Sequence, residues 1–525
     1  MEDVAIPCPA RSVLGTLETV PDSPMTSCTA SSPAASSAAA GTGRWPDPWP
    51  APYAAHPVEG TVELPGSKSL TNRWLVLAAI ASGPCTLHGV LRSRDTDLMR
   101  GALSALGAVF SDCPDGSLHV TPLPVGEPLP ALVDVDCGLA GTVMRFLPLI
   151  AALRPGTVRL DGDPGARVRP MGPTVQALRG LGVQVTEEGE PGRLPLTLSV
   201  PDGLHDDGPR LGASRTGPSA GAAAADLGTA ATARMLELDA SESSQFLSAV
   251  LLSACAHPGG LTVRHTGATV PSPEHVGMTL AALREVGVDA TAVDKRTFAV
   301  PGARPRPFTV TVEPDLSNAG PFLAAAAVTG GTVRIPRWPA ETTQIGERWR
   351  RILPAFGAQV EFLPDAQDPT HGVLEVRGGC DASGAPTLTG AGEVPDTAEL
   401  APTVAALALL AAGPTQLPGI GHLRGHETNR LAALTAEAAR FGVPVAEGAD
   451  RLDFPGREAA GDLTPAEAQT YHDHRMATFA AVVGLAVPGT TVRDVGTTAK
   501  TMPDFPAMWT SLVAPAAGAD EAGAL

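Results

Sequence analysis

The segment LPGSKSLTNR, residues 64–73, gathers a lysine, an arginine and two serines around the predicted start of a helix. The apolar stripe of that helix consists of Leu70, Trp74, Leu77 and Ile80, so we expect the helix to begin near Ser67 or Ser69. Free backbone N–H groups and the positive end of the helix dipole attract anions at such a position. The segment predicts a phosphate or carboxylate site, although a capped helix with solvated charges would have the same sequence.

Lysine is rare in this chain, and its placement is informative. Of the 37 Lys and Arg residues only three are lysines, and two of these, Lys68 and Lys500, lie in short runs rich in Ser, Thr and Pro. A compact ammonium whose pKa can shift differs chemically from a planar guanidinium. We therefore expect Lys68 and Lys500 to share one site, with chance retention as the alternative.

Three further segments resemble polar or glycine-rich helix starts. They are CGLAGTVMRFLPLI with Gly141 and Thr142, GDPGARVRPM with Arg169, and SESSQFLSAV with Ser243, Ser244 and Gln245. Each one alone also fits an ordinary turn. Their repetition in one chain, several with an arginine within one turn, favours repeated anion binding.

Acidic residues follow in the last third of the chain. Asp396 precedes the apolar run of EVPDTAELAPTVAALALL, Glu427 lies between two arginines in RGHETNR, and Arg475 opens an apolar helix in YHDHRM. A carboxylate flanked by arginines can carry a proton in a phosphate site, or it can form a helix-surface ion pair. His472 and His474 diverge on a helix and have no third ligand at a suitable spacing, so we expect no metal.

Composition excludes several classes of protein. The formal net charge of -18 argues against a nucleic-acid surface, and no apolar run reaches the length of about 18 residues that a membrane span needs. The seven cysteines lie far apart in the chain, which favours a reducing, cytoplasmic location.

One local pattern recurs along the chain, an amphipathic helix end followed by glycine and a β-type run. The glycines are Gly107, Gly182, Gly287, Gly357 and Gly442. The pattern predicts helices closed by a left-handed glycine. Allowing for a Gly/Ala/Ser/Thr-rich insert at 202–235, which we expect to be mobile, it predicts six α/β units in two halves. Residues 1–50 and 516–525 are predicted to be a disordered arm and tail.

Taken in order, the segments LPGSKSLTNR, GLAGTVMRF, RVRPM, SSQF, EPDLSNAGPFLAAA, RGHETNR, DHRM and AKTMPDF resemble the EPSP synthases (3-phosphoshikimate 1-carboxyvinyltransferases) of actinobacterial type. The resemblance covers about residues 57 to 510. It implies an α/β (α+β type) enolpyruvyl transferase fold, a two-lobed inside-out α/β barrel of six βαβαββ units. The lobes would be residues 67–313, and 52–66 plus 314–515.

The resemblance also implies a reaction without cofactor or metal. The 5-hydroxyl of shikimate 3-phosphate attacks C2 of phosphoenolpyruvate while C3 is protonated, and the adduct then loses phosphate. The enzyme would be a cytoplasmic monomer of the shikimate pathway, which supplies chorismate for aromatic amino acid biosynthesis, and a target of glyphosate.

Site residues follow from the matching motifs. The resemblance implies four catalytic residues, Asp396, Glu427, Lys68 and Lys500. Phosphoenolpyruvate would be bound by Lys68, Gly141, Thr142, Arg169, Arg430, Arg475 and Lys500. Shikimate 3-phosphate would be bound by Lys68, Ser69, Arg73, Ser243, Ser244, Gln245, Ser272, Asp396, His422 and His426.

Two alternatives remain open. The UDP-N-acetylglucosamine enolpyruvyl transferases carry a cysteine five residues before an Arg-Pro pair, where this chain has Pro164 before Arg169. A non-catalytic anion-binding paralogue would be expected to lack one of the acids or lysines, and all of them are present in this sequence.

Overall fold

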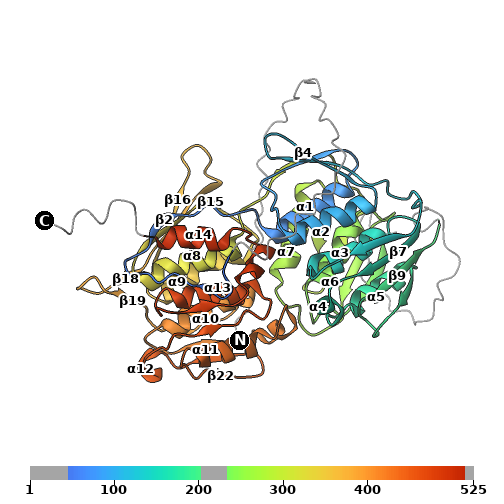
Figure 1. Cartoon of the computed structure of the whole chain (residues 1–525). Coiled ribbons are helices and arrows are strands. Elements are labelled where there is room, and N and C mark those ends of the chain that lie inside the picture. The colour runs from blue at the N-terminus through green and yellow to red at the C-terminus, as the bar shows by residue number, and fades with distance from the viewer. Residues whose placement is uncertain (1–44, 203–232, 515–525) are drawn as a thin grey trace. The chain divides into compact units, whose positions relative to one another are not determined.

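The structure is a computed structural model that describes residues 45–202 and 233–514 (Figure 1). Most of the predicted arm, insert and tail therefore lies outside the described residues. Strand β1 (Trp49–Pro50) lies at the end of the predicted arm, and strand β10 (Arg234–Leu238) begins at the end of the predicted insert. No helix within the described ranges is long and apolar enough to cross a membrane.

Five four-stranded sheets in the described part of the chain share one pairing pattern. In each sheet a parallel pair of strands is followed by two antiparallel pairings. A parallel pair requires a crossover connection, which a helix supplies in three of the sheets, whereas the parallel pairs β3–β14 and β2–β15 join segments far apart in the chain. The mixed α/β class predicted from the sequence is confirmed.

Three of these sheets belong to a first core cluster, made of buried residues between Leu70 and Val312. One sheet has the order β14 (Thr309–Thr311), β3 (Cys85–His88), β5 (Leu118–Thr121), β4 (Val109–Asp112). The next has the order β6 (Val133–Asp136), β7 (Gly156–Asp161), β9 (Leu196–Val200), β8 (Gln184–Glu187). The third has the order β10, β11 (Leu261–His265), β13 (Thr297–Val300), β12 (Thr291–Ala292).

A second core cluster contains buried residues Trp49 to Leu64 and Leu316 to Leu512. One of its sheets has the order β16 (Gln359–Pro364), β17 (His371–Arg377), β15 (Thr332–Pro339), β2 (Glu59–Thr61). Another has the order β20 (Gly392–Glu393), β21 (Thr415–Leu417), β23 (Leu452–Phe454), β22 (Ala446–Glu447). Smaller sheets pair β1 with β25 (Thr491–Val492) and β24 (Glu467–Ala468), and β18 (Gly379–Cys380) with β19 (Pro386–Thr387).

Helices of both halves contribute many of the buried residues of the two clusters. The first cluster contains α1 (Lys68–Ala79), α2 (Arg94–Ala105), α3 (Gly141–Ala151), α4 (Pro164–Arg167), α5 (Gly172–Leu181), α6 (Gln245–Ala254) and α7 (Glu274–Glu285). The second contains α8 (Leu316–Thr329), α9 (Trp349–Ala355), α10 (Ala401–Leu410), α11 (Arg430–Arg440), α12 (Arg457–Ala460), α13 (His474–Gly484) and α14 (Phe505–Val513). Short 3₁₀ turns are η2 (Ile345–Arg348), η3 (Ala398–Leu400), η4 (Gly421–Gly425) and η5 (Val495–Lys500).

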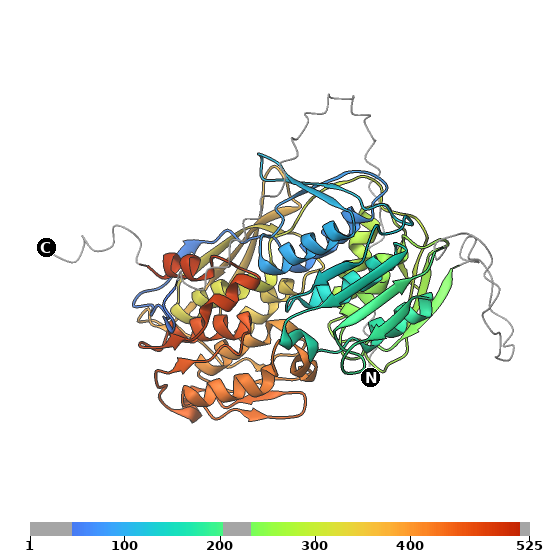
Figure 2. The same ribbon diagram turned by 45° about the vertical axis from the view of Figure 1, so that its right-hand side comes forward.

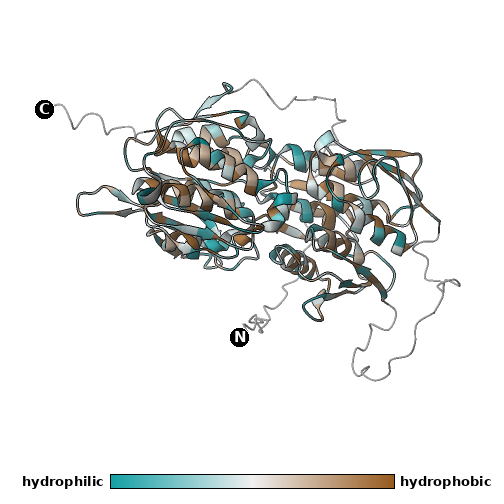
Figure 3. Ribbon diagram, turned by 90° about the horizontal axis from the view of Figure 1, so that it is seen from below, coloured by the Kyte–Doolittle hydropathy of each residue, from teal (hydrophilic) through white to brown (hydrophobic). Residues whose placement is uncertain are grey.

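Three of these helices are buried along their whole length. Every residue of α3, α8 and α10 is buried, which is typical of a helix that is hydrophobic all round. In Figures 1 and 2 the sheets flank these helices, and in Figure 3 much of the hydrophobic, brown ribbon lies on helices. Because the bodies of these helices are buried between sheets, their N-terminal ends are the positions where polar groups can act.

The predicted glycine-closed helix ends are confirmed at all five positions. Each glycine has a positive φ, between 83° and 102°. At each end the residue after the glycine donates a backbone hydrogen bond five residues back, as Val443 does to Ala438 at 2.9 Å. This bond and the one donated by the glycine define the Schellman motif, which turns the chain from helix into strand.

Within the described residues, the chain crosses between the two clusters twice, each time between a strand and the helix that follows it. Strand β2 pairs in a sheet of the second cluster yet leads into α1 of the first, and β14 pairs in the first yet leads into α8 of the second. The two crossing segments are bonded to each other, because Ser67 donates its N–H to the carbonyl of Glu313 (2.8 Å) and Asp315 to that of Pro65 (2.9 Å). Val62, the residue after β2, continues the pairing of that strand, because its N–H donates to the carbonyl of Arg334 (2.9 Å).

We expect Gly442→Ala to lower the free energy of unfolding by about 1–2 kcal/mol, because alanine is strained at its φ of 90°. The urea unfolding midpoint measures this change. Gly101→Ala is the matched control, since Gly101 lies inside α2 with nothing within 4 Å of an added Cβ. That variant should be stabilised by about 0.5–1 kcal/mol. Equal effects of the two substitutions would contradict this interpretation of the helix ends.

Candidate functional site

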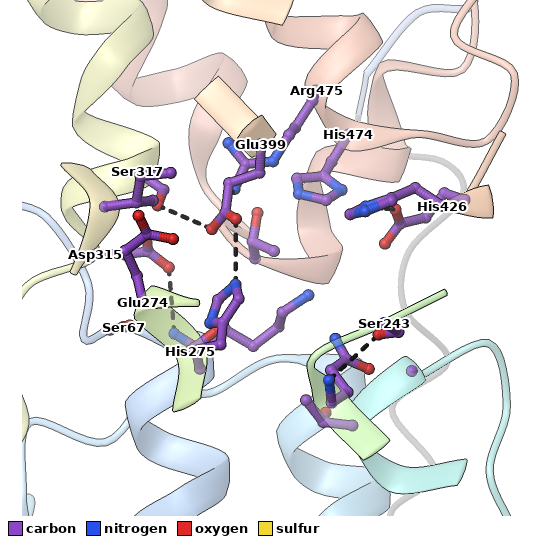
Figure 4. A pocket seen from close by; sticks show the side chains of 18 of the residues that line it. Ser67, Ser243, Glu274, His275, Asp315, Ser317, Glu399, His426, His474 and Arg475 are labelled. Carbon is purple, nitrogen blue, oxygen red and sulfur yellow. Dashed lines mark hydrogen bonds and ion pairs between the residues drawn. The ribbon is translucent and has the colours of Figure 1, made fainter. Parts of the chain in front are cut away.

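A polar pocket lies where helix starts of both core clusters meet (Figure 4). Eleven of the predicted site residues line it: Lys68, Ser69, Gly141, Thr142, Arg169, Ser243, Gln245, His426, Glu427, Arg430 and Arg475. Residues that the sequence analysis did not assign also line it, among them Ser67, Arg145, Glu274, His275, Asp315, Ser317, Glu399 and His474. Among the described residues no group of three or more His, Cys, Asp or Glu side chains is arranged to hold a metal.

Lys68 occupies the first turn of α1, as its sequence context predicted. Ser67 is the N-cap and accepts the backbone N–H of Leu70, while the N–H of Lys68 donates to Asp315 (3.2 Å). Asp315 also accepts the N–H of Asn318, so one buried carboxylate caps the starts of both α1 and α8. Burial lowers the pKa of the Lys68 ammonium, Asp95 at 3.5 Å opposes this, and Lys500 lowers the pKa further. Lys68 and Lys500 therefore lie in one electrostatic environment, as the hypothesis required.

Arg73 lies behind the pocket and is 1% exposed. Its guanidinium donates to the hydroxyls of Thr279 (2.8 Å) and Ser248 (3.2 Å) and to the carbonyls of Ser69 and His275 (both 3.0 Å). Burial lowers the pKa of Arg73 to about 9. Through these hydrogen bonds Arg73 fixes the backbone of two pocket residues, Ser69 and His275. Arg73 does not itself line the pocket.

The starts of α3 and α6 form one wall. Gln245 accepts a hydrogen bond from Arg145 (2.7 Å), so its amide N–H₂ is the group left to bind an acceptor. Gly141 lies close to Arg169 and Gln245. A Cβ added at Gly141 would lie 2.9 Å from the Arg169 guanidinium and 3.2 Å from the Gln245 oxygen. A larger residue at position 141 would push Arg169 out of place.

A chain of alternating charges runs along the opposite wall. Lys500 donates to Glu427 (2.7 Å), Arg430 donates to the other oxygen of Glu427 (2.9 Å), and Arg430 also donates to Asp473 (2.7 Å). Burial raises the pKa of the Glu427 carboxyl, but Lys500, Arg430 and Arg169 outweigh it and hold that pKa well below its usual range. The alternative of an ion pair on a helix surface does not apply, since Glu427 precedes α11 in a loop and Arg430 is 1% exposed.

Asp396 is not brought into the pocket. Its backbone has a φ of 58°, its side chain is exposed, and only its carbonyl is held, by Arg348. The acid that lines the pocket is Glu399, three residues later in η3. Glu399 is next to His275 (3.2 Å), Ser317 (3.4 Å) and Arg475 (3.9 Å) (Figure 4). The structure therefore places Glu399, and not Asp396, in the lining of the pocket.

Burial raises the pKa of Glu399, but His275, Arg475 and His426 outweigh it, so this carboxyl is held well below its usual range. It is ionised at neutral pH. Glu399 directly precedes the fully buried α10, and that position, an acid at the start of an apolar run, is the sequence signal that would have identified it.

Four other predicted residues do not line the pocket in the described structure, and one of them, Lys500, reaches it only through its ion pair with Glu427 (2.7 Å). Ser244 is buried as the N-cap of α6, Ser272 has a φ of 47° just before α7, and His422 packs edge-on against His426 with ring centroids 5.9 Å apart. Three residues after Ser272, His275 does line the pocket.

The pocket can hold anions while keeping carboxylates ionised beside them. Lys68, Arg145, Arg169, Arg430 and Arg475 line it together with Glu399 and Glu427. Guanidinium forks recognise carboxylate and phosphate groups with two parallel hydrogen bonds. Carboxylates beside bound anions are suited to proton transfer, because a negative ligand raises their pKa.

Comparison with solved structures gives the class of the fold. EPSP synthase from Acinetobacter baumannii superposes with a TM-score of 0.68 at 22% identity, covering 88% of this chain and 97% of that chain. The enolpyruvyl transferase NikO from Streptomyces tendae gives a TM-score of 0.60 at 18% identity, covering 88% of this chain and 96% of that one. The fold is that of the enolpyruvyl transferases.

Sequence comparison narrows this class. The family described as EPSP synthase (3-phosphoshikimate 1-carboxyvinyltransferase) matches residues 52–208 and 210–509. Proteins named 3-phosphoshikimate 1-carboxyvinyltransferase from Kocuria rhizophila and Bifidobacterium longum are 47% and 45% identical over 466 residues. Those matches cover 87% and 88% of this chain and 94% and 97% of the relatives. The chain belongs to the EPSP synthase family and has 3-phosphoshikimate 1-carboxyvinyltransferase activity.

We expect Glu427→Gln to lower the melting temperature more at pH 7 than at pH 3. The folded-state pKa of Glu427 is depressed, so its stabilising contribution is present above its unfolded pKa and is lost as pH falls through the folded value. Thermal unfolding of both proteins between pH 3 and pH 7 measures this difference. A difference in melting temperature that grows as the pH falls would contradict the assigned ion pairs.

Proposed function

We propose that this enzyme transfers the enolpyruvyl group of phosphoenolpyruvate to the 5-hydroxyl of shikimate 3-phosphate, releasing phosphate. The observation that carries the proposal is the pocket itself, in which five cations lie among five acidic residues, two of which, Glu399 and Glu427, have a pKa held well below the usual range. The two substrates together bring about five negative charges, and binding them in contact requires fixed cations to offset their repulsion.

The two substrates are assigned to different walls. Phosphoenolpyruvate would lie against Arg169, Arg430 and Arg475, with Lys68 and Lys500 between it and the other substrate. Shikimate 3-phosphate would lie against Ser69, Ser243, Gln245 and His426. Support for this division comes from Arg145, which holds the Gln245 oxygen and leaves its amide as a donor. Arg73 and Ser244 would act from behind this wall.

Glu399 would accept the proton of the 5-hydroxyl as that oxygen attacks C2. The pKa of Glu399 is well below the usual range because of His275, Arg475 and His426 despite burial. Bound anions raise the pKa of a nearby carboxyl, so the substrates themselves would bring Glu399 closer to the value that suits a general base. In this assignment Glu399 takes the role that the sequence analysis gave to Asp396.

Glu427 and Lys500 would serve C3. The ammonium of Lys500 lies 2.7 Å from the Glu427 carboxylate, so a proton can pass between them. Phosphoenolpyruvate bound to Arg430 and Arg169 would weaken the cations' hold on Glu427 and raise its pKa. The pair could then deliver a proton to C3 during addition and remove one during loss of phosphate.

We further propose that the chain is a cytoplasmic monomer with an inside-out α/β barrel in each half and that glyphosate competes at the phosphoenolpyruvate wall. Support for the location comes from Cys85, Cys137 and Cys255, which are buried and reduced. Support for the barrel comes from the shared pairing pattern of the sheets and the buried helices α3, α8 and α10.

We expect the purified enzyme to release phosphate only when shikimate 3-phosphate and phosphoenolpyruvate are both present. A coupled phosphate assay measures the release, with each substrate omitted in turn. Substitution of UDP-N-acetylglucosamine for shikimate 3-phosphate is the control. Release with that sugar nucleotide, or with phosphoenolpyruvate alone, would overturn the proposed function.

We expect Glu399→Gln to lower kcat by about 10²-fold or more, as removal of a general base does. Asp396→Asn should change kcat by less than about threefold, because the Asp396 side chain is exposed and only its carbonyl is bonded. Steady-state kinetics of the two variants under saturating substrates provide the comparison. A large loss in Asp396→Asn with full activity in Glu399→Gln would restore the assignment made from the sequence.

A further inference from the structure

The turn that carries Glu399 has an unusual backbone. Asp396 and Ala398 have φ values of 58° and 40°, a region that residues other than glycine rarely adopt. Such conformations persist only where surrounding contacts hold them, and they concentrate at functional sites. The contacts that hold this turn are therefore informative about how Glu399 is positioned.

One contact reaches Glu399 itself from the other core cluster. His275, in the first turn of α7, places Nε2 3.2 Å from Oε2 of Glu399, and the two side chains are 16% and 12% exposed (Figure 4). Because the carboxylate is ionised, Nε2 of His275 is the donor. The second oxygen of Glu399 accepts from Ser317 (3.4 Å), so both oxygens have a fixed direction.

The backbone of His275 is itself immobilised. Its carbonyl accepts hydrogen bonds from Arg73 (3.0 Å), Ser248 (3.3 Å) and Thr279 (2.9 Å). The imidazole therefore projects from a fixed point of the first cluster onto a carboxylate of the second. A substitution of the side chain leaves these backbone contacts available.

A second contact joins the same two segments one residue away. Arg348 donates both to Glu274, the neighbour of His275, and to the carbonyl of Asp396. The strained turn is thus held at Asp396 by Arg348 and at Glu399 by His275. The contact of His275 with Glu399 and that of Arg348 with Glu274 both depend on the start of α7 lying against η3.

We propose that His275 is a positioning residue for the reaction, which orients the carboxylate of Glu399 toward the 5-hydroxyl across the junction of the two clusters. This inference rests on the proposed function, because it assumes that Glu399 is the proton acceptor. The general base, Glu399 oriented by His275, is then complete only when the start of α7 in the first cluster contacts η3 in the second. Substrate binding that stabilises this contact would also assemble the base.

Other charged groups act on Glu399 and must be considered in any pH experiment. Arg475 lies 3.9 Å from it, and it is coupled electrostatically to His426, Arg73, His422 and Arg430. All of these remain when His275 is replaced. The change in pH profile caused by the substitution therefore reports the His275 contribution alone.

The test compares kcat, KM and the pH dependence of kcat for wild type, His275→Phe, His275→Gln, Glu399→Gln and the double variant His275→Phe/Glu399→Gln. We expect His275→Phe to lower kcat by about tenfold or more, with KM for shikimate 3-phosphate changed by less than about threefold. The acid limb of kcat should move to higher pH, because loss of His275 raises the pKa of Glu399. His275→Gln retains an N–H donor and should recover part of kcat. The double variant should be no slower than Glu399→Gln.

The control is His371→Phe, which removes another His–carboxylate pair, that of His371 with Asp368 at 3.1 Å on the exposed surface. It should leave all parameters unchanged. Additive losses in the double variant, or a change in KM alone, would overturn the positioning role while leaving the function intact. Full activity of Glu399→Gln would instead refute the assigned base, and with it this inference. Thermal unfolding of each variant establishes that it is folded.

Discussion

The buried carboxylate of Asp315 connects the two halves of this protein at the point where the chemistry is located. It accepts the backbone N–H of Lys68 at the start of α1 and that of Asn318 at the start of α8. Each of those helices begins at a crossing between the core clusters, so the bonds of one side chain fix both crossings. Burial raises the pKa of Asp315, and its stabilisation comes from Arg475, the two N–H groups and Lys68. An acid at this place is tolerated only because so many donors converge on it.

Convergence of helix starts accounts for the composition of the pocket. Ends of α1, α3, α6, α7, α8, α11 and α13 bring free N–H groups, hydroxyls and cations to one region, while the apolar bodies of these helices fill the clusters behind them. An acidic protein with a net charge of -18 can thereby present a local excess of anion-binding groups. The carboxylates in the pocket stay ionised because their cationic neighbours outweigh the cost of burial.

Much of this arrangement was predictable from the sequence because it depends on local rules. Ser67 caps α1 where the sequence predicted that helix to begin, and the five glycines end their helices in the left-handed region. Which acid near position 396 enters the pocket was not predictable from the sequence. The direction of a side chain before a helix depends on backbone angles, and the spacing of residues does not reveal these angles. The positive φ of Asp396 turns its side chain outward and brings Glu399 inward. One of the two interpretations of Glu427 likewise put it on a helix face, whereas it lies in the loop before α11.

The exchange of strands at the two crossings has a consequence for dissection of the molecule. Strand β2 is covalently attached to the first helix of one cluster but completes a sheet of the other, and β14 does the reverse. A fragment cut at either crossing would lose the parallel edge of one sheet or carry a strand with no partner, and an unpaired strand edge invites aggregation. We therefore expect the two halves to fold only together. A protein fragment consisting of one half alone would contain an incomplete sheet.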